Sequence, residues 1–428
     1  MASTPPPTLS SVSPPVPSYV VALADDLSGA AETACALGGP VRLSLNAVAV
    51  AETAAAHDLV VDLDTRRLPP AEAAYAVRTA LRAAQAGPPR LLYKKVDSQL
   101  RGHLAAEAAA YAEGAEAVVI AAALPAAGRT VTGGVVHVKG VPLHLTDGWR
   151  AERASAPRSL AEALSGLPVR TVPLDVVRSG PAALGAEFRR IAASGAHPAP
   201  DAETDADLDT VAAVALRLGP GFRLLGSGGL AAALGRALLR PAAITSLPAA
   251  VTSPPAPLAS PPTSSGDGTP LLFVVGTAEP GAVAQIAHLT ALGAHHVPLD
   301  PADLAAGTVR LPRTAAAPAL TVLSIEGSAG PRPGAGRALS TALGALAAAY
   351  PGRPDLVLTG GETARTTLDA LDIRELEPLG EIHHGAVHSR TSDGRRVVTR
   401  PGSYGAEDSL LRIALALRPH LAPATAAP

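Results

Sequence analysis

Residues 19–29 read YVVALADDLSG, an apolar run that ends in two acids, a serine and a glycine. The apolar part predicts a buried strand over 19–24, and the polar end predicts a turn into a helix after Gly29. The same alternation recurs and predicts strands at 58–63, 90–96, 117–123, 271–275, 320–325 and 355–359, and helices at 69–86, 102–112, 281–292 and 336–349. Such alternation is typical of parallel sheets with helices on both faces, so we expect an α/β fold.

Two proline-rich segments set the predicted domain boundaries. Residues 1–18 contain six prolines and no charged side chain, which predicts a disordered tail. Residues 241–270 contain eight prolines and one charge, which predicts an extended linker. We therefore expect two α/β domains, 19–240 and 271–418, each a mainly parallel sheet flanked by helices, with the active site in the cleft between them. Residues 419–428 are expected to form a second tail.

Composition excludes several classes of partner. The 35 basic and 37 acidic residues nearly cancel, so no net field would draw the whole molecule to nucleic acid or to an anionic membrane. No stretch approaches roughly 18 uninterrupted apolar residues, so no membrane span is expected. The single cysteine, Cys35, cannot form an intrachain disulfide, which favours a reducing compartment and a cytoplasmic location.

Lysine is scarce in this chain. Of the 35 basic residues, three are lysines (Lys94, Lys95 and Lys139) and the other 32 are arginines. Such a skew is typical of a coding bias that replaces lysine wherever arginine is tolerated, so the remaining lysines mark positions that need a compact point charge. Lys94 and Lys95 are adjacent on a predicted strand and should point to opposite faces, so only one of them is expected to reach a shared site directly.

Polar residues follow the predicted strands of the first half. Ligands of parallel sheets bind at the carboxyl ends of strands. Asp25 and Asp26 follow the first strand; capping of the next helix is the simpler interpretation, but it needs only one acid. Arg66 follows another strand and suits capture of a carboxylate or phosphate, the alternative being a solvated loop charge. In the block YKKVDSQLRG at 93–102, cations beside Asp97 would keep it ionised and suit it as a base.

Glycine-rich turns follow strands in the second half. TGGETA at 359–364 opens a helix, and its backbone amides suit phosphate oxygens, although one such turn is often a plain connection. VGT at 275–277 and RPGSYG at 400–405 are similar, and three glycine turns with hydroxyls in one domain predict a nucleotide site. No metal site is predicted, because the histidines at 383–388 lack nearby cysteines.

Four motifs in order resemble those of the four-carbon acid sugar kinases, a former domain of unknown function that includes D-threonate, D-erythronate and 3-oxo-tetronate kinases. The family patterns A-D-D-F/L-T-G, K-K-I/V-D-S-T-L-R-G, P-x-x-G-R-T and T-G-G-D/E-T-A correspond to residues 24–29, 94–102, 125–130 and 359–364. The resemblance covers the chain from residue 19 to about residue 418.

The chain departs from the family patterns at several positions. Ser28 and Gln99 stand where the family has threonine, and Thr277 stands where it usually has serine. Arg400 replaces the lysine of a K-P-G-G-F-G motif, and HGAVH at 384–388 replaces a P-G-I/V-P segment.

The resemblance implies that the first domain binds the sugar acid and the second binds ATP. It places the acid site at Asp25, Asp26, Arg66, Lys95, Asp97, Ser98 and Arg101. It places the nucleotide site at Thr277, Gly360, Gly361, Glu362, Thr363, Gly402 and Gly405.

The expected reaction is phosphoryl transfer from Mg-ATP to the terminal 4-hydroxyl of a four-carbon sugar acid. Asp97 or one of the Asp25/Asp26 pair would accept the hydroxyl proton, and Asp97, Lys95 and Asp26 are the candidate catalytic residues. Arg66 or Arg101 would hold the carboxylate, Lys95 would offset developing charge, and Mg²⁺ would screen the triphosphate. The expected partners are the sugar acid, ATP and, in a homodimer, a second copy of the chain.

Two other functions remain open at this point. A non-catalytic sugar-acid sensor is suggested by the altered segment at 384–388, and calorimetry showing acid binding without ATP binding would favour it. A nicotinamide-dependent oxidoreductase rests on the α/β pattern and on the turn at 226–229, but the full dinucleotide fingerprint is missing.

Overall fold

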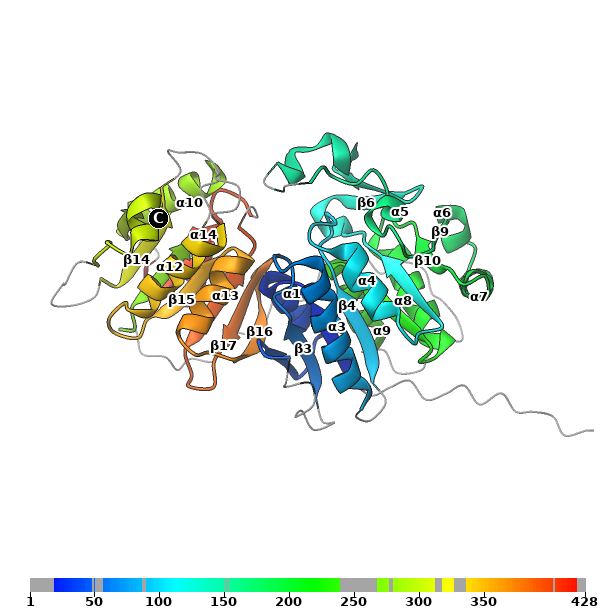
Figure 1. Ribbon diagram of the computed structural model, residues 1–428. Coiled ribbons are helices and arrows are strands. Elements are labelled where there is room, and N and C mark those ends of the chain that lie inside the picture. Colours follow the sequence, from blue (N-terminus) through cyan, green and yellow to red (C-terminus); the bar gives the residue numbers. More distant parts are fainter. Residues whose placement is uncertain are drawn as a thin grey trace, which may run out of the picture.

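The computed structural model describes residues 19–47, 50, 57–86, 90–150, 152, 154–238, 268–276, 280–311, 318–326, 336–402 and 405–421 (Figure 1). We call residues 19–238 the N-terminal half and residues 268–421 the C-terminal half. The predicted tail at 1–18, Thr277 and most of the predicted linker lie outside the described residues.

Thirteen strands form one large sheet. Those of the N-terminal half are β1 (Val20–Ala24), β2 (Val41–Ser44), β3 (Asp58–Asp62), β4 (Leu91–Lys95), β5 (Ala117–Ala121) and β11 (Phe222–Gly226). Those of the C-terminal half are β12 (Leu271–Val275), β13 (His295–Leu299), β14 (Leu320–Ile325), β15 (Asp355–Thr359), β16 (Glu375–His383), β17 (Ala386–Arg390) and β18 (Arg396–Arg400). Their order is β13-β14-β12-β15-β18-β17-β16-β2-β3-β1-β4-β11-β5.

The two halves share this sheet, which corrects the expectation of two separate sheets. Neighbouring strands are parallel within each half except around β16, which pairs antiparallel with β17, as β17 does with β18. β16 also pairs antiparallel with β2, with Leu376 opposite Leu43. An exposed sheet edge leaves backbone hydrogen-bonding groups unpaired. Here the edge strand β2 of one half pairs with the edge strand β16 of the other, so these backbone groups find partners. The predicted α/β class with mainly parallel strands is confirmed.

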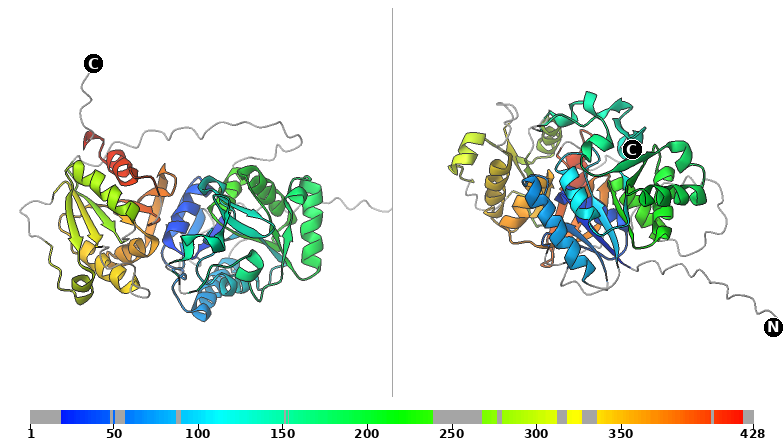
Figure 2. Two further views of the ribbon diagram at one scale, coloured as in Figure 1. Left: turned by 90° about the horizontal axis from the view of Figure 1, so that it is seen from above. Right: turned by 45° about the vertical axis from the view of Figure 1, so that its right-hand side comes forward.

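Helices cover both faces of the sheet, and the two halves lie side by side along it (Figure 2). The helices of the N-terminal half are α1 (Leu27–Leu37), α3 (Pro70–Gln85), α4 (Leu104–Ala112), α5 (Leu160–Ala163), α6 (Leu174–Val177), α7 (Pro181–Ala193), α8 (Asp205–Leu218) and α9 (Gly228–Leu238). Those of the C-terminal half are α10 (Pro280–Ala291), α11 (Pro301–Ala306), α12 (Gly336–Ala348), α13 (Gly361–Ala370) and α14 (Ser409–Leu417). Helix α1 contacts α9 in its own half and α13 in the other half.

Smaller elements decorate the N-terminal half. A three-stranded sheet contains β6 (Arg129–Thr132), β7 (Val135–Val138) and β8 (Val141–Pro142), and a two-stranded sheet contains β9 (Val169–Val172) and β10 (His197–Pro200). Short 3₁₀ helices of this half are η1 (Pro125–Ala127), η2 (Leu143–Leu145) and η3 (Asp147–Trp149), and the C-terminal half contains η4 (Pro419–Leu421). η4 lies in the segment that was predicted to be a tail.

The core explains why the strands are continuous apolar runs. Val21 and Leu23 of β1 pack in one apolar cluster, whereas Val20 and Ala22 pack in another on the opposite face. Strands buried on both faces are typical of parallel sheets covered by helices. The larger cluster also contains Leu272 and other residues of the C-terminal half, so apolar packing continues from one half into the other.

Every strand and helix predicted from the alternation is present, with ends that agree to within a few residues. The short strand β2 was not predicted, and it is the strand that joins the halves. Within the described parts of the chain, none of the helices has the length and apolar character needed to cross a lipid bilayer.

Candidate functional site

Asp25 and Asp26 follow β1 and both hold one arginine. Asp26 is the N-cap of α1, and its Oδ1 accepts a hydrogen bond from the Gly29 amide at 3.1 Å. Arg66 donates from Nε to Asp25 Oδ2 at 2.9 Å and from Nη2 to Asp26 Oδ1 at 2.8 Å. The capping interpretation is therefore correct for Asp26, but the pair of acids also fixes Arg66, which capping does not require.

The two acids differ in their affinity for protons. Burial alone would raise the pKa of Asp25, but the charges of Arg66 and Lys94 hold it below its usual value. Burial raises the pKa of Asp26 above its ordinary value, and the neighbouring Asp25 and Asp97 carboxylates add to this effect while Arg66 opposes it. Of the two, Asp26 is thus the better proton acceptor.

The two lysines at the end of β4 point to opposite faces, as alternation predicts. Lys94 is fully buried and its Nζ lies 2.7 Å from Glu107 Oε2 on α4. Lys95 lies on the face of α1, where its Nζ is 3.3 Å from Glu32 Oε2. Lys95 is therefore the lysine that reaches the shared site.

Asp97 is held tightly by Arg101. Arg101 donates from Nε to Asp97 Oδ2 at 2.7 Å and from Nη2 to Oδ1 at 3.0 Å. Burial would raise the pKa of Asp97, but Arg101 and more distant arginines hold it far below its ordinary value. Asp97 stays ionised, as expected, and is a weak base. Next to it, Ser98 Oγ accepts a hydrogen bond from Arg129.

A pocket where the halves meet brings these residues together. Six of the seven predicted acid-site residues line it: Asp26, Arg66, Lys95, Asp97, Ser98 and Arg101. Asp25 is buried behind them and is 3% exposed. The C-terminal half contributes His384, Gly385 and Pro401 to the lining. The position agrees with topology, because β3 and β4 flank β1 and the carboxyl ends of these strands form a switch point.

The glycine turn after β15 lies against this pocket. Gly360 has a φ of 96°, a conformation that favours glycine, and Gly361 begins α13. A β-carbon on Gly361 would lie 2.6 Å from Asp26 Oδ2 and 3.1 Å from Ser28 Oγ. The predicted phosphate turn of one half therefore touches the predicted acid site of the other.

Thr363 and Glu362 are two other predicted nucleotide residues, and the side chain of Thr363 is closely packed. A β-carbon on Gly276 would lie 1.8 Å from Thr363 Oγ1, and this hydroxyl is also 3.4 Å from Ser340 Oγ. The Thr363 side chain is therefore buried between Gly276 and Ser340, so only its backbone is left to face a nucleotide. Glu362 lies in the first turn of α13, where burial raises its pKa and the charges of Arg67 and Arg337 oppose the shift.

Arg400 is not among the described residues that line this pocket, and buried polar groups hold its charged end. Its side chain is 2% exposed, and Nη1 donates to Gln285 Oε1 at 2.8 Å and to Ser409 Oγ at 2.7 Å. Burial lowers its pKa to about 10. Its Nε also bonds the carbonyl of Pro401, so Arg400 fixes the start of the loop that carries Gly402 and Gly405. Gly405 has a φ of 98°, which favours glycine there.

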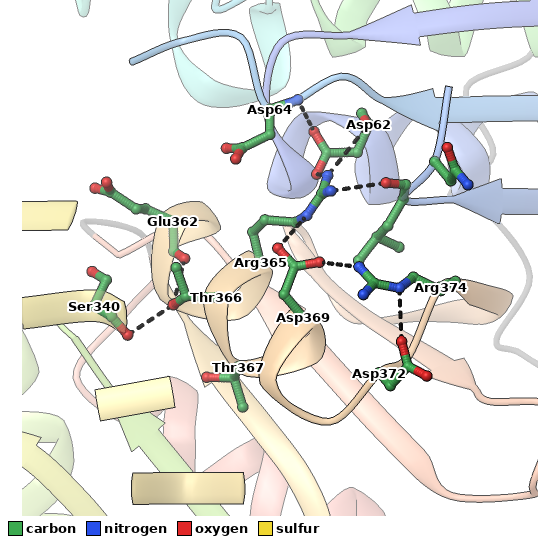
Figure 3. A network of polar contacts seen from close by, with 12 residues as sticks. Asp62, Asp64, Ser340, Glu362, Arg365, Thr366, Thr367, Asp369, Asp372 and Arg374 are labelled. Atoms are coloured by element: carbon green, nitrogen blue, oxygen red, sulfur yellow. Dashed lines mark hydrogen bonds and ion pairs between the residues drawn. The ribbon is translucent and has the colours of Figure 1, made fainter. Parts of the chain in front are cut away.

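An ion-pair network connects α13 to the end of β3 (Figure 3). Arg365 Nη1 donates to Asp62 Oδ2 at 2.9 Å, and its Nη2 donates to the Leu45 carbonyl at 2.8 Å. Burial raises the pKa of Asp62 to about 7, with Arg365 opposing the shift. Asp62 and Asp64 lie just before Arg66 in the sequence. Asp64 Oδ2 lies 2.7 Å from Nη2 of Arg337 on α12. Helices of the C-terminal half thus hold the loop that presents Arg66.

Four residues of this region were missed as site residues. Glu32, Arg129 and His384 line the pocket, and Arg365 connects the halves. Only Arg129 carried a local signal, a glycine-supported turn after a strand. Glu32, His384 and Arg365 have no distinctive neighbours in sequence. Their place in this region depends on contacts with residues far along the chain.

The glycines of the turn at 226–229 are closely packed against other parts of the N-terminal half. A β-carbon on Gly228 would lie 2.2 Å from Glu32 Oε1, and one on Gly229 would lie 2.5 Å from the Ala123 carbonyl. These glycines allow the start of α9 to pack closely against α1 and against the segment after β5, so the observation that suggested an oxidoreductase has a packing explanation.

Comparisons with known proteins agree with this geometry. A sugar-binding N-terminal domain family matches residues 20–234, and a nucleotide-binding C-terminal domain family matches residues 272–410. A D-threonate kinase of Cupriavidus necator is 35% identical over 415 residues, which cover 91% of this chain and 95% of the relative. The chain belongs to the four-carbon acid sugar kinase family.

Other members of this kinase family are also similar. A D-threonate kinase of Bordetella bronchiseptica is 31% identical, with 94% of this chain and 98% of the relative covered. A D-erythronate kinase of Heliobacterium modesticaldum is 33% identical over 214 residues, 46% of this chain and 47% of that protein. A crystal structure from Haemophilus influenzae aligns with a TM-score of 0.64 at 18% identity, covering 92% of this chain and 98% of that one, and supports the fold alone.

Proposed function

We propose that this kinase transfers the γ-phosphoryl group of Mg-ATP to the 4-hydroxyl of a four-carbon sugar acid of the threonate, erythronate or oxo-tetronate type. One observation carries the proposal: Gly361, in the turn that begins α13, lies directly against Asp26 and Ser28. A helix N-terminus with glycines suits phosphate, and a carboxylate beside it suits the hydroxyl that receives the phosphoryl group.

The proposal assigns the acid to the N-terminal half and ATP to the C-terminal half, with transfer where they meet. The carboxyl ends of β12, β15 and β18 lie side by side in the sheet and carry the three glycine turns. This arrangement supports a nucleotide site at that edge, because ligands of parallel sheets bind there.

Mg²⁺ is proposed to arrive with ATP. Within the described residues, no group of three His, Cys, Asp or Glu side chains could hold a metal ion. Mg²⁺ is commonly held by substrate phosphates and one or two carboxylates. The residues present fit a Mg-ATP substrate better than a resident metal.

Asp26 is proposed as the proton acceptor, in preference to Asp97. Among the described residues, both hydrogen bonds to the Asp26 carboxylate go to Oδ1, whereas Oδ2 faces Gly361. Its raised pKa also suits a base, whereas both oxygens of Asp97 accept hydrogen bonds from Arg101. As the phosphoryl group moves to the substrate oxygen, the hydroxyl proton passes to Asp26 Oδ2, and Lys95 offsets negative charge nearby.

An ADP-release assay tests the proposed reaction. D-Threonate, D-erythronate and oxo-tetronate isomers are supplied with Mg-ATP, with D-threonate first because similar relatives bear that name. We expect at least one acid to stimulate ADP release and to yield a 4-phosphate by NMR. If no acid raises ADP release above the background rate, the proposal is wrong.

A second measurement tests the base. Asp26→Asn should lower kcat by about 10²–10⁴-fold, the usual contribution of a general base. Asp97→Asn should lower kcat much less than Asp26→Asn, because Arg101 holds Asp97 as a weakly basic carboxylate. Asp372→Asn is the control, since this side chain is 88% exposed and pairs with Arg374. A kcat of Asp26→Asn within threefold of wild type would remove Asp26 from this role.

A cytoplasmic location and a homodimer are also proposed. They rest on the single cysteine and on the resemblance, respectively.

A further inference from the structure

Two of the arginines in the pocket are already neutralised by carboxylates. Arg66 pairs with Asp25 and Asp26, and Arg101 pairs with both oxygens of Asp97. Each would have to release an ion pair, at a cost, to bind the carboxylate of a substrate with full strength. An arginine that is not held by a carboxylate would bind the anionic end of the sugar acid at a lower cost.

Arg129 is the pocket arginine without such a pair. It begins β6 and, among the described residues, its only hydrogen bond is from Nη1 to the neutral Ser98 hydroxyl. Its Nε is buried and has no hydrogen-bond partner in the described structure. A buried guanidinium N–H without an acceptor is costly, and an anionic ligand supplies the missing acceptor.

His384 faces the same pocket from the C-terminal half. The two-residue turn between β16 and β17 contains His384 and Gly385, and both line the pocket. The neighbouring His383 points elsewhere, because its Nε2 lies 3.0 Å from Ser409 Oγ beside Arg400. The His384 side chain is 39% exposed, so a ligand in the pocket can reach it.

Charged groups around His384 determine its protonation. Its Nδ1 lies 3.8 Å from Glu381 Oε2, and Glu381 raises the pKa of the ring above its ordinary value. Glu32 on α1 acts in the same direction, whereas burial and Arg129 oppose it. The other charged groups that line the pocket are Asp26, Arg66, Lys95, Asp97 and Arg101. Arg129 and protonated His384 are thus two cationic groups that line one pocket, and an anion bound between them would be attracted to both.

We propose that Arg129 and His384, one from each half of the chain, bind the carboxylate of the sugar acid. The proposal rests on the proposed function and places the two ends of the substrate: its carboxylate at Arg129 and His384, and its 4-hydroxyl at Asp26. The acid is then bound by both halves, next to the turn that is proposed to bind the phosphates of ATP.

Steady-state kinetics of Arg129→Gln tests the carboxylate site. A hydrogen bond to a charged group contributes enough binding energy that we expect KM for the acid to rise about 10- to 100-fold, with KM for ATP within about twofold of wild type. Arg129→Lys should restore part of the affinity because it keeps the charge but loses the fork. The control is Arg390→Gln, which removes a charge from the same hairpin as His384, where Arg390 pairs with the exposed Glu377.

The pH profile tests His384. The protonated ring binds a carboxylate, so affinity for the acid is highest below the pKa of His384 and falls as pH rises through it. We expect 1/KM for the acid to fall by at least about threefold between about pH 6 and pH 8.5 in wild type, and to be nearly flat in His384→Asn. Asp62 and all other groups are intact in both proteins, so the difference reports His384 alone.

Calorimetry with the acid alone separates this inference from the proposed function. If wild type binds the acid but releases no ADP, the kinase proposal fails and the binding constants of the variants still test the carboxylate site. If Arg129→Gln binds the acid as tightly as wild type, or if His384→Asn keeps the wild-type pH profile, the inference is wrong.

Discussion

Arg365 allows the strength of the contact between the halves to be tested. Arg365→Met keeps the length of the side chain and removes its charge, leaving the Asp62 carboxylate, which is fully buried, without its cation. The Leu45 carbonyl loses its Arg365 donor at the same time. Breaking a buried ion pair by removing one partner costs about 3–5 kcal/mol, so we expect a loss of that size in the free energy of unfolding at alkaline pH.

The loss should depend on pH, because Asp62 can take up a proton. Burial raises the pKa of Asp62 to about 7 with Arg365 in place, and removing Arg365 raises it further. A carboxyl group whose pKa is higher in the folded than in the unfolded state stabilises the folded protein at pH values below the unfolded pKa. This stabilisation is lost as pH rises through the folded pKa. In wild type the loss is nearly complete about one pH unit above the folded pKa of about 7, whereas in Arg365→Met it continues to higher pH. The deficit of the variant should therefore widen between about pH 6 and pH 8.5, by up to about 1.4 kcal/mol per pH unit.

Urea unfolding followed by circular dichroism at several pH values measures both quantities. Adding Asp62→Asn to Arg365→Met removes the unpaired charge and should recover about 2 kcal/mol at pH 8.5, which a double-mutant cycle quantifies. Arg374→Gln is the matched control: its side chain is 50% exposed and pairs with Asp369 and Asp372 of its own half, so it should cost less than about 1 kcal/mol. A deficit of Arg365→Met below about 1 kcal/mol at pH 8.5, or one that is independent of pH, would refute the reasoning.

Two further substitutions separate contacts that belong to the site from those that belong to the core. Gly361→Ala places a β-carbon 2.6 Å from Asp26 Oδ2 and should lower kcat/KM for the acid at least about tenfold, whereas Gly281→Ala in α10, where nothing lies within 4 Å, should leave it unchanged. Equal kinetics of the two alanine variants would contradict a close approach of the halves during catalysis. Lys94→Met should cost about 3–5 kcal/mol of stability, because Glu107 is left buried without its cation, while Lys95→Met should mainly lower kcat. A stable Lys94→Met protein with impaired turnover would mean that the two lysines have been assigned to the wrong faces.

Local patterns were sufficient to predict seven of the thirteen described strands of the large sheet and the residues at their ends. The apolar runs of β1, β12 and β15 are buried on both faces, so their sequences are continuous and easily read. The rule that ligands bind at the carboxyl ends of parallel strands then selected Asp26, Lys95 and Gly361, which the structure brings together from three distant segments.

Lysine scarcity was informative for a reason that the structure makes clear. Lys94 and Lys95 are both almost fully buried, and each ammonium group lies near one carboxylate, Glu107 and Glu32 respectively. A guanidinium is larger and has five donors to satisfy, so arginine would not fit either position without new acceptors.

The connection between the halves could not be predicted, because it depends on partners far apart in the chain. Asp62 and Arg365 are 303 positions apart, and neither has a sequence neighbourhood that differs from that of an ordinary surface charge. β2 is four residues long with an exposed arginine at its second position, which is a weak strand signal. Its pairing with β16 arises because each strand is an unsatisfied edge, and such an edge exists only once both halves have formed.

The choice of Asp26 over Asp97 as the proton acceptor could not be made from the charged residues near each of them in the sequence. Cations near Asp97 in the sequence correctly predict that it is ionised, but the same cations stabilise the carboxylate and so weaken it as a base. A proton acceptor works best when its pKa lies near the working pH, which here requires burial and neighbouring acids rather than neighbouring cations. Asp26 meets that requirement because Asp25 and Asp97 flank it and because β1 places it out of solvent. Of the two acids, Asp97 has the more stable negative charge and holds Arg101. Asp26 has the less favourable charge and lies against the turn that is proposed to carry the phosphoryl group.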